Sequence, residues 1–132
     1  MKRLVMFVTI LALALLLAAC GGDEPAAASL TFEGNDSLQF NPATASVPAG
    51  SEVTVTLNNA GALEHSWTLV GNDADVATVT DADAINSAST GTVAGGASDT
   101  LTFTAPAAGT YKYVCTVPGH AAGGMVGTLT VQ

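Results

Sequence analysis

The chain has 132 residues, of which 48% are hydrophobic, and 3 Lys and Arg stand against 11 Asp and Glu, a formal net charge of −8. This length fits one domain, and the apolar content is too high for a disordered chain. So few basic residues argue against a nucleic-acid partner, which needs clustered Lys and Arg, and two cysteines cannot build a disulfide framework.

Residues 1–19 have the pattern of a bacterial lipoprotein signal peptide. A basic start at residues 2–3 precedes an apolar run, interrupted only by Thr9, that ends in small residues. The run is short for a membrane-spanning helix, which needs about 20 apolar residues. The motif LAAC at 17–20 resembles the lipobox, in which the signal is cut before a cysteine that becomes acylated. We therefore expect Cys20 to be the lipidated first residue of the mature protein; an ordinary signal peptide and a retained anchor are the alternatives.

Residues 20–28 are predicted to form the lipidated cysteine and a flexible tether, because they are small, polar and interrupted by Pro. The eight residues after the cysteine span at most about 28 Å when extended. Loss of the signal peptide leaves Lys112 as the only basic side chain against eleven acids, a net charge of −10. The mature protein is expected to be an exported monomer, lipid-anchored to the outer face of the cytoplasmic membrane, in the periplasm or at the cell surface.

Residues 29–132 are predicted to form one all-β domain. Strands are expected where apolar and polar residues alternate, at 52–57, 65–69, 100–104, 111–115 and 127–131. Several short strands separated by turns, without a convincing amphipathic helix, predict a β-sandwich. Residues 72–98 are rich in Ala, Asp, Ser and Gly and have weak periodicity. They are expected to form a long excursion on the sandwich, with one helical turn around 73–77.

The rare His, Cys and Met residues of the mature chain fall into one pattern. Cys115, His120 and Met125 are spaced Cys-x4-His-x4-Met, and His65 lies fifty residues before the cysteine. Two imidazoles and a thiolate in a trigonal plane, with a weak axial thioether, form the ligand set of a blue-copper electron-transfer site. Soft sulfur favours Cu(I), whereas imidazole binds both oxidation states. We therefore expect one type 1 copper per chain, bound by His65, Cys115 and His120 with Met125 axial, and no catalytic residue.

The sequence around these residues resembles the cupredoxins. The stretch CTVPGH at 115–120 resembles azurins, and GGMVGTLTV at 123–131 resembles plastocyanins. The mixture, with TFTAPAAGTY at 102–111, is most similar to auracyanins, which are membrane-associated cupredoxins of filamentous anoxygenic phototrophs. The resemblance implies an eight-stranded Greek-key sandwich with copper at its loop-rich end. It also implies that the ring edge of His120 meets solvent and redox partners.

One position departs from many cupredoxins, which have Asn directly after the first His to tie the two ligand loops together. Here the residue is Ser66, whose shorter side chain is expected to tie the loops less well.

Around His120, small residues are expected to form a flat apolar docking face: Pro118, Ala121, Ala122 and Gly123.

Other conspicuous residues have structural explanations. Trp67 is expected to pack in the core rather than relay electrons. Tyr111 follows a Gly turn and is expected to make a tyrosine-corner hydrogen bond. The acids form one local cluster, for which plain solubility is favoured over the steering of a basic partner: Asp73, Asp75, Asp81 and Asp83.

Together these features predict a lipid-anchored blue-copper carrier that shuttles single electrons and is not an enzyme. Its partners would be redox proteins of a membrane electron-transport chain that dock near His120. The alternative is a copper carrier or chaperone lipoprotein without an electron-transfer role, although such sites are usually open and richer in Met or His. A metal-free structural sandwich leaves the ligand set unexplained. Zinc also suits two His and one Cys, but the affinity order of divalent ions favours copper.

Overall fold

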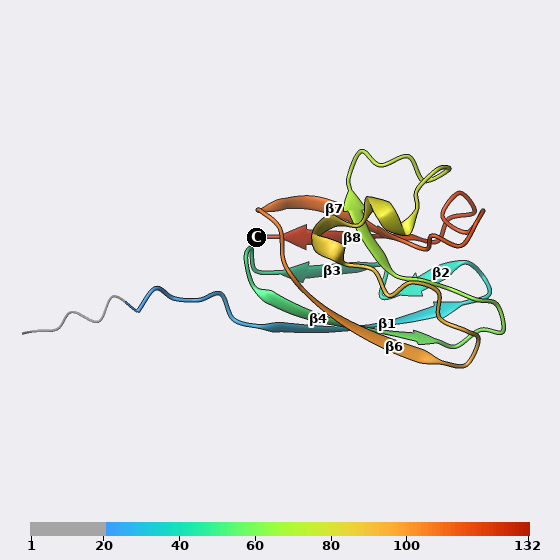
Figure 1. Cartoon of the computed structure of the whole chain (residues 1–132), viewed down its shortest axis with the longest axis horizontal. Helices are drawn as coiled ribbons and strands as arrows, with labels where there is room; N and C mark the ends of the chain where they lie inside the picture. Colours follow the sequence, from blue (N-terminus) through green and yellow to red (C-terminus); the bar gives the residue numbers. More distant parts are fainter. Residues whose placement is uncertain (1–20) are drawn as a thin grey trace, which may run out of the picture.

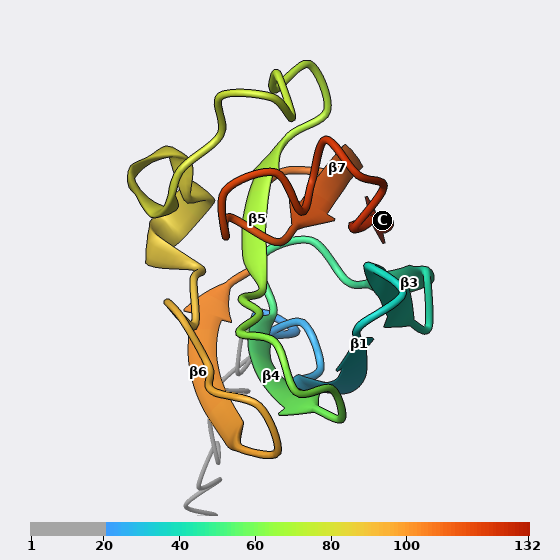
Figure 2. The ribbon, with the colours of Figure 1, turned by 90° about the vertical axis from the view of Figure 1, so that its right-hand side faces the viewer.

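A computed structural model describes residues 21–132; the predicted signal peptide (1–19) and Cys20 lie outside the described residues. Eight β-strands form two four-stranded sheets that face each other (Figures 1 and 2). The prediction of an all-β, eight-stranded sandwich is therefore confirmed. Within residues 21–132, no helix is long and apolar enough to cross a membrane.

The order of the strands shows how the chain passes between the two sheets. One sheet contains, from edge to edge, β2 (Gln39–Asn41), β1 (Ala28–Asn35), β4 (Glu52–Asn59) and β6 (Ser98–Thr104). The other contains β3 (Thr44–Val47), β8 (Val126–Val131), β7 (Gly109–Val114) and β5 (Thr68–Gly71). Strands β1 and β4 are parallel, as are β3 and β8, and the other neighbours are antiparallel. Because a parallel pair needs a crossover, the chain leaves the first sheet through β3 before it returns in β4.

Strand β4 follows the alternation that predicted it. Val53, Val55 and Leu57 are fully buried between the sheets. Thr54 and Thr56 lie on the opposite face, where their hydroxyls bond to threonine hydroxyls of β6 at 3.1 and 3.0 Å. Apolar side chains on one face and hydroxyl ladders on the other thus fix the register of the two strands.

An aromatic cluster fills the middle of the sandwich. The ring of Trp67 stacks on Phe32 and Tyr113, with both centroid distances at 5.6 Å, and Phe32 lies 4.7 Å from Tyr113. Trp67 is fully buried, so the prediction that it packs in the core is confirmed. Trp67 lies two residues after His65, and Tyr113 lies two residues before Cys115. The cluster therefore supports both chain segments that carry the rare residues.

Two tyrosines of β7 fix the turns beside them. The hydroxyl of Tyr111 donates to the carbonyl of Ala107 at 2.8 Å, which confirms the predicted tyrosine corner. The hydroxyl of Tyr113 donates to the carbonyl of Pro42 at 2.8 Å, and burial raises the pKa of Tyr113. The Tyr113 ring crosses β8 at Gly127, where an added Cβ would overlap the ring.

The excursion between β5 and β6 covers residues 72–97 and runs along one side of the sandwich, between the edge strands of the two sheets (Figure 2). It contains two single-turn 3-10 helices, η1 (Asp81–Asp83) and η2 (Ile85–Ser87). The helical turn expected at 73–77 is wrong. The carboxylate of Asp75 accepts the N–H of Ala77 at 2.9 Å and closes an isolated turn. Helical structure begins instead after Thr80, which donates its N–H and hydroxyl to Asp83 at 2.8 and 2.9 Å.

The two ends of the sandwich differ. Residues 21–27 lead into the start of β1, at the left of Figure 1, whereas the loop of residues 115–125 lies at the right. Near the end of β1, an added Cβ on Gly34 would touch Met125 and His65. The rare residues therefore lie about 26 Å, the length of an eight-residue strand, from the end where the chain enters.

Candidate metal centre

Two connections between strands bring the four rare residues together. His65 lies between β4 and β5, where its backbone pairs with Val93 of the excursion at 3.1 and 2.7 Å. Cys115 directly follows β7, and Met125 directly precedes β8. Between them, the N–H of Cys115 donates to the carbonyl of Met125 at 3.1 Å, and the N–H of Met125 donates to that of His120 at 3.0 Å. One closed loop thus presents three of the four side chains.

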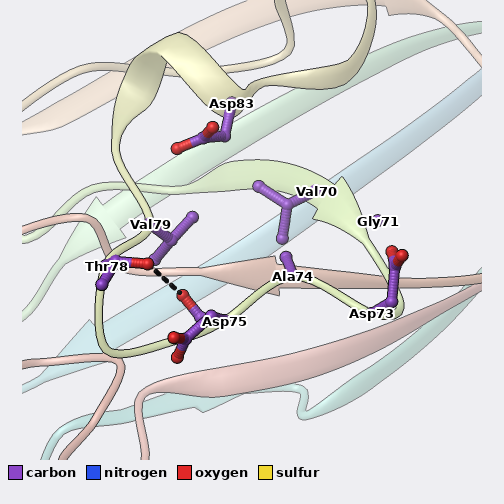
Figure 3. A pocket seen from close by; sticks show the side chains of 8 residues that line it. All are labelled: Val70, Gly71, Asp73, Ala74, Asp75, Thr78, Val79 and Asp83. Carbon is purple, nitrogen blue, oxygen red and sulfur yellow. Dashed lines mark hydrogen bonds between the residues drawn. The ribbon is translucent and has the colours of Figure 1, made fainter.

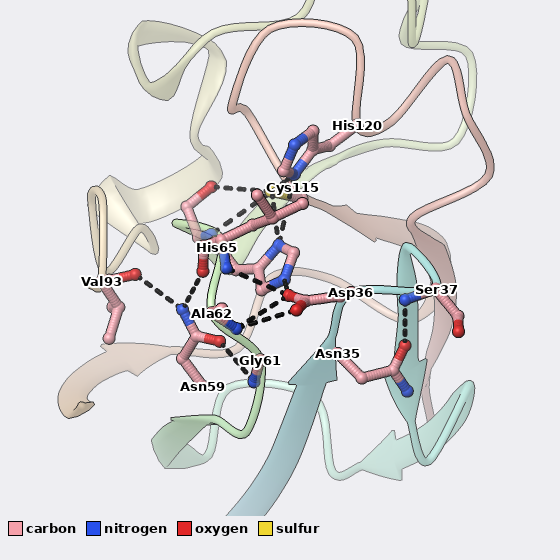
Figure 4. A network of polar contacts seen from close by, with 12 residues as sticks. Asn35, Asp36, Ser37, Asn59, Gly61, Ala62, His65, Val93, Cys115 and His120 are labelled. Carbon is pink, nitrogen blue, oxygen red and sulfur yellow. Dashed lines mark hydrogen bonds and ion pairs between the residues drawn. The ribbon is translucent and has the colours of Figure 1, made fainter. Parts of the chain in front are cut away.

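Three donor atoms converge at this place (Figure 4). The Nδ1 atoms of His65 and His120 lie 3.2 Å apart, and Sγ of Cys115 lies 4.0 and 3.5 Å from them. A divalent ion bound at about 2.0 Å to each nitrogen and 2.3 Å to sulfur, in one plane, separates the donors by about 3.5 to 3.7 Å. The observed spacing therefore suits a single three-coordinate ion. His65 and Cys115 are fully buried, whereas His120 is half-buried.

The fourth residue, Met125, is fully buried, and its backbone bonds to Cys115 and His120 hold it in the same loop. An added Cβ on Gly34 would lie 3.1 Å from the Met125 methyl carbon and 3.6 Å from Cβ of His65. Gly34 therefore leaves the space into which the end of the Met125 side chain fits. A thioether is a weak, soft donor, which matches the axial position expected from the sequence.

The two nitrogens of His65 have different surroundings. Nδ1 faces Cys115 and His120, whereas Nε2 lies 3.6 Å from Oδ1 of Asp36 and has no hydrogen-bond partner in the described part of the chain. Burial lowers the pKa of His65, and the nearby His120 lowers it further, against the opposing effect of Asp36. His65 is therefore neutral near pH 7, the form in which imidazole binds metals.

Asp36, in the turn between β1 and β2, is held in place by backbone N–H groups. Ala62 donates to both carboxylate oxygens at 3.0 and 2.9 Å, and Leu63 donates to Oδ1 at 3.1 Å (Figure 4). These bonds lower the pKa of Asp36. An added Cβ on Gly61 would overlap the carboxylate, so this cradle needs glycine. Sequence reasoning missed Asp36, because no spacing links it to His65.

Ser66 joins the chain segment that carries His65 to the segment that carries Cys115. Its hydroxyl oxygen accepts the N–H of Thr116 at 2.8 Å and lies 2.8 Å from the hydroxyl of Thr116. The N–H of Ser66 donates to Sγ of Cys115 at 3.3 Å. The short side chain therefore still spans the gap, because Thr116 offers it both a backbone and a hydroxyl partner.

The small residues near His120 do not all face outward. Three of the four expected in a docking face are exposed: Pro118, Ala122 and Gly123. The prediction is wrong for Ala121, which is 4% exposed and packs against valines of β5 and β7. The turn closed by the Gly123 N–H and the Gly119 carbonyl, at 2.9 Å, directs Ala121 inward. Within residues 21–132, Leu63 is the one large apolar residue that is exposed, at 48%.

The acidic cluster expected from the sequence divides into two parts. Three members line a hollow of about 180 Å³ between the end of β5 and the excursion: Asp73, Asp75 and Asp83 (Figure 3). Asp81 does not line this hollow. Its carboxylate lies instead among hydroxyl groups, one of which belongs to Thr116, the residue after Cys115. The four acids therefore do not form one surface patch.

Comparison with known proteins agrees with this geometry. Residues 26–132 match the family of copper-binding proteins described as plastocyanin/azurin. Auracyanin-A of Chloroflexus aurantiacus is 34% identical to this chain, and the alignment covers 89% of the chain and 90% of that protein. The copper-resistant cuproprotein CopI of Rubrivivax gelatinosus is 32% identical, over 74% of this chain and 62% of CopI.

The solved structures include similar folds. The crystal structure of dithionite-reduced auracyanin from the photosynthetic bacterium Roseiflexus castenholzii matches with a TM-score of 0.70 and 33% sequence identity. The match covers 79% of this chain and 96% of that one. The resemblance to auracyanins that the motifs indicated is thus confirmed.

Proposed function

Because the chain belongs to the plastocyanin/azurin family of copper-binding proteins, we propose that it is a blue-copper electron carrier that works outside the cytoplasmic membrane. The family and the two-His, one-Cys donor set give it one copper site. The observation that carries the proposal is the convergence of Nδ1 of His65, Nδ1 of His120 and Sγ of Cys115. These atoms would hold the ion, with Met125 as the weak axial ligand. Bound copper supplies a one-electron change between Cu(I) and Cu(II).

The protein's own contribution is to keep the donor atoms in place. The stacked Trp67 and Tyr113 lie two residues from His65 and Cys115, and backbone bonds close the ligand loop. Donors held in this way move little when the charge of the site changes, which favours fast electron transfer. Burial of His65 and Cys115 keeps water away from the thiolate.

The half-buried His120 is the proposed point of electron exit and entry. The exposed Pro118, Ala122 and Gly123 are small residues, so a redox protein of a membrane electron-transport chain can approach the ring closely. The proposal includes a monomer, a signal peptide at 1–19 and a lipid anchor on Cys20, supported by the LAAC motif. It assigns no enzymatic activity to the chain.

Copper titration of the purified full-length protein tests this function. Addition of Cu(II) is expected to give an intense visible thiolate-to-copper charge-transfer band and an EPR signal that both saturate at one copper per chain. The physical reason is the covalent bond that a buried thiolate makes with Cu(II). A colourless protein that takes up stoichiometric zinc would contradict the proposal.

Mass spectrometry of the membrane-bound form tests acylation of Cys20, with Cys20→Ala as the control.

One alternative is a copper carrier that donates the ion itself, and the similarity to CopI, a copper-resistant cuproprotein, is the reason to test it. The two functions differ in how easily copper leaves. Three of the four proposed ligands are fully buried, so an electron carrier should keep Cu(I) during challenge with a weak chelator. Rapid loss of copper under that challenge would support the carrier instead.

Asp36 gives a prediction about the reduction potential. Asp36→Asn removes a negative charge 3.6 Å from Nε2 of His65 and keeps an acceptor for the backbone N–H groups. Less negative charge beside a ligand favours Cu(I). We expect the potential to rise by on the order of 50 mV, a little under a tenfold change in a one-electron equilibrium. Redox titration followed at the visible band measures it.

Glu64→Gln is the matched control for this variant, because Glu64 and Asp36 are both exposed, but within residues 21–132 only Asp36 makes an ion-pair contact with the His65 ring. The potential of Glu64→Gln should change much less than that of Asp36→Asn, since water and salt screen a charge more strongly when it lies farther from the ligand. Equal shifts in the two variants would show that Asp36 acts only as a surface charge.

A further inference from the structure

We propose that Asp81, in the excursion between β5 and β6, is a positioning residue for the copper thiolate. Through Thr116, it sets the direction of the hydroxyl hydrogen bonds so that the O–H of Ser66 points away from the sulfur of Cys115. The inference rests on the proposed function, because it requires a bond between copper and Cys115. Asp81 is not itself a proposed copper ligand, and it lies outside the two loops that carry the proposed ligands.

Asp81 collects hydroxyl groups from three parts of the fold. Its Oδ1 atom accepts hydrogen bonds from Thr116 at 2.6 Å, Ser89 at 2.9 Å and Thr68 at 3.1 Å. Thr116 directly follows Cys115, Thr68 starts β5, and Ser89, which follows η2 within the excursion, pairs with Thr68. Burial raises the pKa of Asp81, but the three hydroxyl bonds outweigh it, so the pKa is lowered. The group is therefore a carboxylate near pH 7.

A carboxylate fixes the direction of the hydroxyl chain because it can only accept hydrogen bonds. The O–H of Thr116 must point to Asp81. The oxygen of Thr116 is then left as an acceptor, so the 2.8 Å contact with Ser66 requires the O–H of Ser66 to donate to it. The oxygen of Ser66 accepts the N–H of Thr116 at the same time.

This direction decides which group of Ser66 reaches the sulfur. The hydroxyl oxygen of Ser66 lies 3.9 Å from Sγ of Cys115, so it could donate there if Thr116 did not take its hydrogen. With Asp81 in place, the sulfur receives the N–H of Ser66, at 3.3 Å, and not the O–H. Loss of Asp81 frees the O–H of Thr116 to donate to Ser66, which releases the O–H of Ser66 toward Sγ.

An added hydrogen bond to the sulfur changes the balance between the two oxidation states. The thiolate carries more negative charge when copper is reduced, because it then donates less electron density to the ion. Hydrogen bonds to more highly charged acceptors are stronger, so the extra bond stabilises the Cu(I) form. Asp81 therefore keeps the reduction potential lower than the same ligands would give without it.

The test compares copper-loaded full-length variants. Asp81→Ala is expected to shift the one-electron equilibrium about tenfold toward Cu(I), which is about 59 mV. It should also lower the Cu–S stretching frequency in resonance Raman spectra, a readout that a distant charge does not move. Asp73→Ala is the matched control, because Asp73 belongs to the same excursion but lines the hollow of Figure 3. It should leave the Cu–S frequency unchanged.

A double-mutant cycle separates the hydroxyl chain from simple charge removal. Thr116→Val removes the hydroxyl between Asp81 and Ser66 and should itself raise the potential. If Asp81 acts through Thr116, adding Asp81→Ala to Thr116→Val should shift the potential no more than Asp73→Ala does alone. Thr116→Val also tests the chain of hydroxyls if Asp81→Ala fails to fold.

Two results would overturn the inference. One is an equal shift in Asp81→Ala and Asp73→Ala with no change in the Cu–S frequency, and the other is full additivity in the double mutant. These failures differ from failure of the proposed function, in which the unsubstituted protein would show no thiolate-to-copper band at all.

Discussion

Replacement of Cys115 by Ser is expected to abolish the visible charge-transfer band completely. The band needs a thiolate on copper, and a serine hydroxyl is a hard donor that stays protonated near pH 7. Copper affinity should fall more than about 100-fold, because changes to outer partners of metal ligands already cost 10- to 100-fold. Visible absorption and EPR during Cu(II) titration measure both effects.

The fold should survive this substitution. Serine is close in size to cysteine, and its oxygen can accept the N–H of Ser66 in place of the sulfur. Met125→Leu is the control within the same loop: it keeps the apolar volume and removes the proposed weak axial ligand, so the band should persist at an altered potential. A band that remained in Cys115→Ser would show that the copper thiolate is not Cys115.

Phe32→Ala is expected to lower the free energy of unfolding by about 3 to 5 kcal/mol, a large part of the 5 to 15 kcal/mol typical of whole domains. Phe32 is fully buried, and its ring contacts Trp67 and Tyr113. Chemical denaturation of the copper-free protein, followed by Trp67 fluorescence, measures the loss. A cavity here should also loosen the segments that carry His65 and Cys115.

The control for this variant is Phe32→Leu, which leaves a smaller cavity and should cost less than half as much. A loss below about 1 kcal/mol in Phe32→Ala would show that the neighbouring rings close the space. Copper binding by Phe32→Leu should keep the same visible band, since the ligands and their hydrogen bonds remain.

The parts of the fold that the sequence predicted are those with a clear period. Apolar residues at every second position in β4 have no other way to bury themselves than in a strand. The excursion has no such period, and its turns depend on side chains that bond to nearby backbone groups. Asp75 and Asp83 each close a turn by such bonds, and the same residue types also occur in open loops. The position of its helical turn could therefore not be predicted.

In the candidate site, rarity singled out His65, Cys115, His120 and Met125, and the structure brings donor atoms of the first three together. The residues around them are common types with no fixed spacing, so the contacts of Asp36 with His65 and of Asp81 with Thr116 became visible only in three dimensions. A carboxylate that accepts from distant hydroxyl groups leaves no pattern in the sequence. The burial of the small residues around His120 was also unpredictable, because nothing in the sequence distinguishes the inward Ala121 from the outward Ala122.

The opposite positions of the chain entry and the metal-binding loop have a further consequence. An acyl group on Cys20 would hold the protein by the end of the sandwich that is far from the loop of residues 115–125 (Figure 1). The tether and β1 together would let the His120 ring reach about 50 Å above the lipid surface. Such a molecule diffuses in two dimensions and searches for partners in a thin layer over the bilayer, so encounter rates would depend on its surface density and on the height of the partner's docking site.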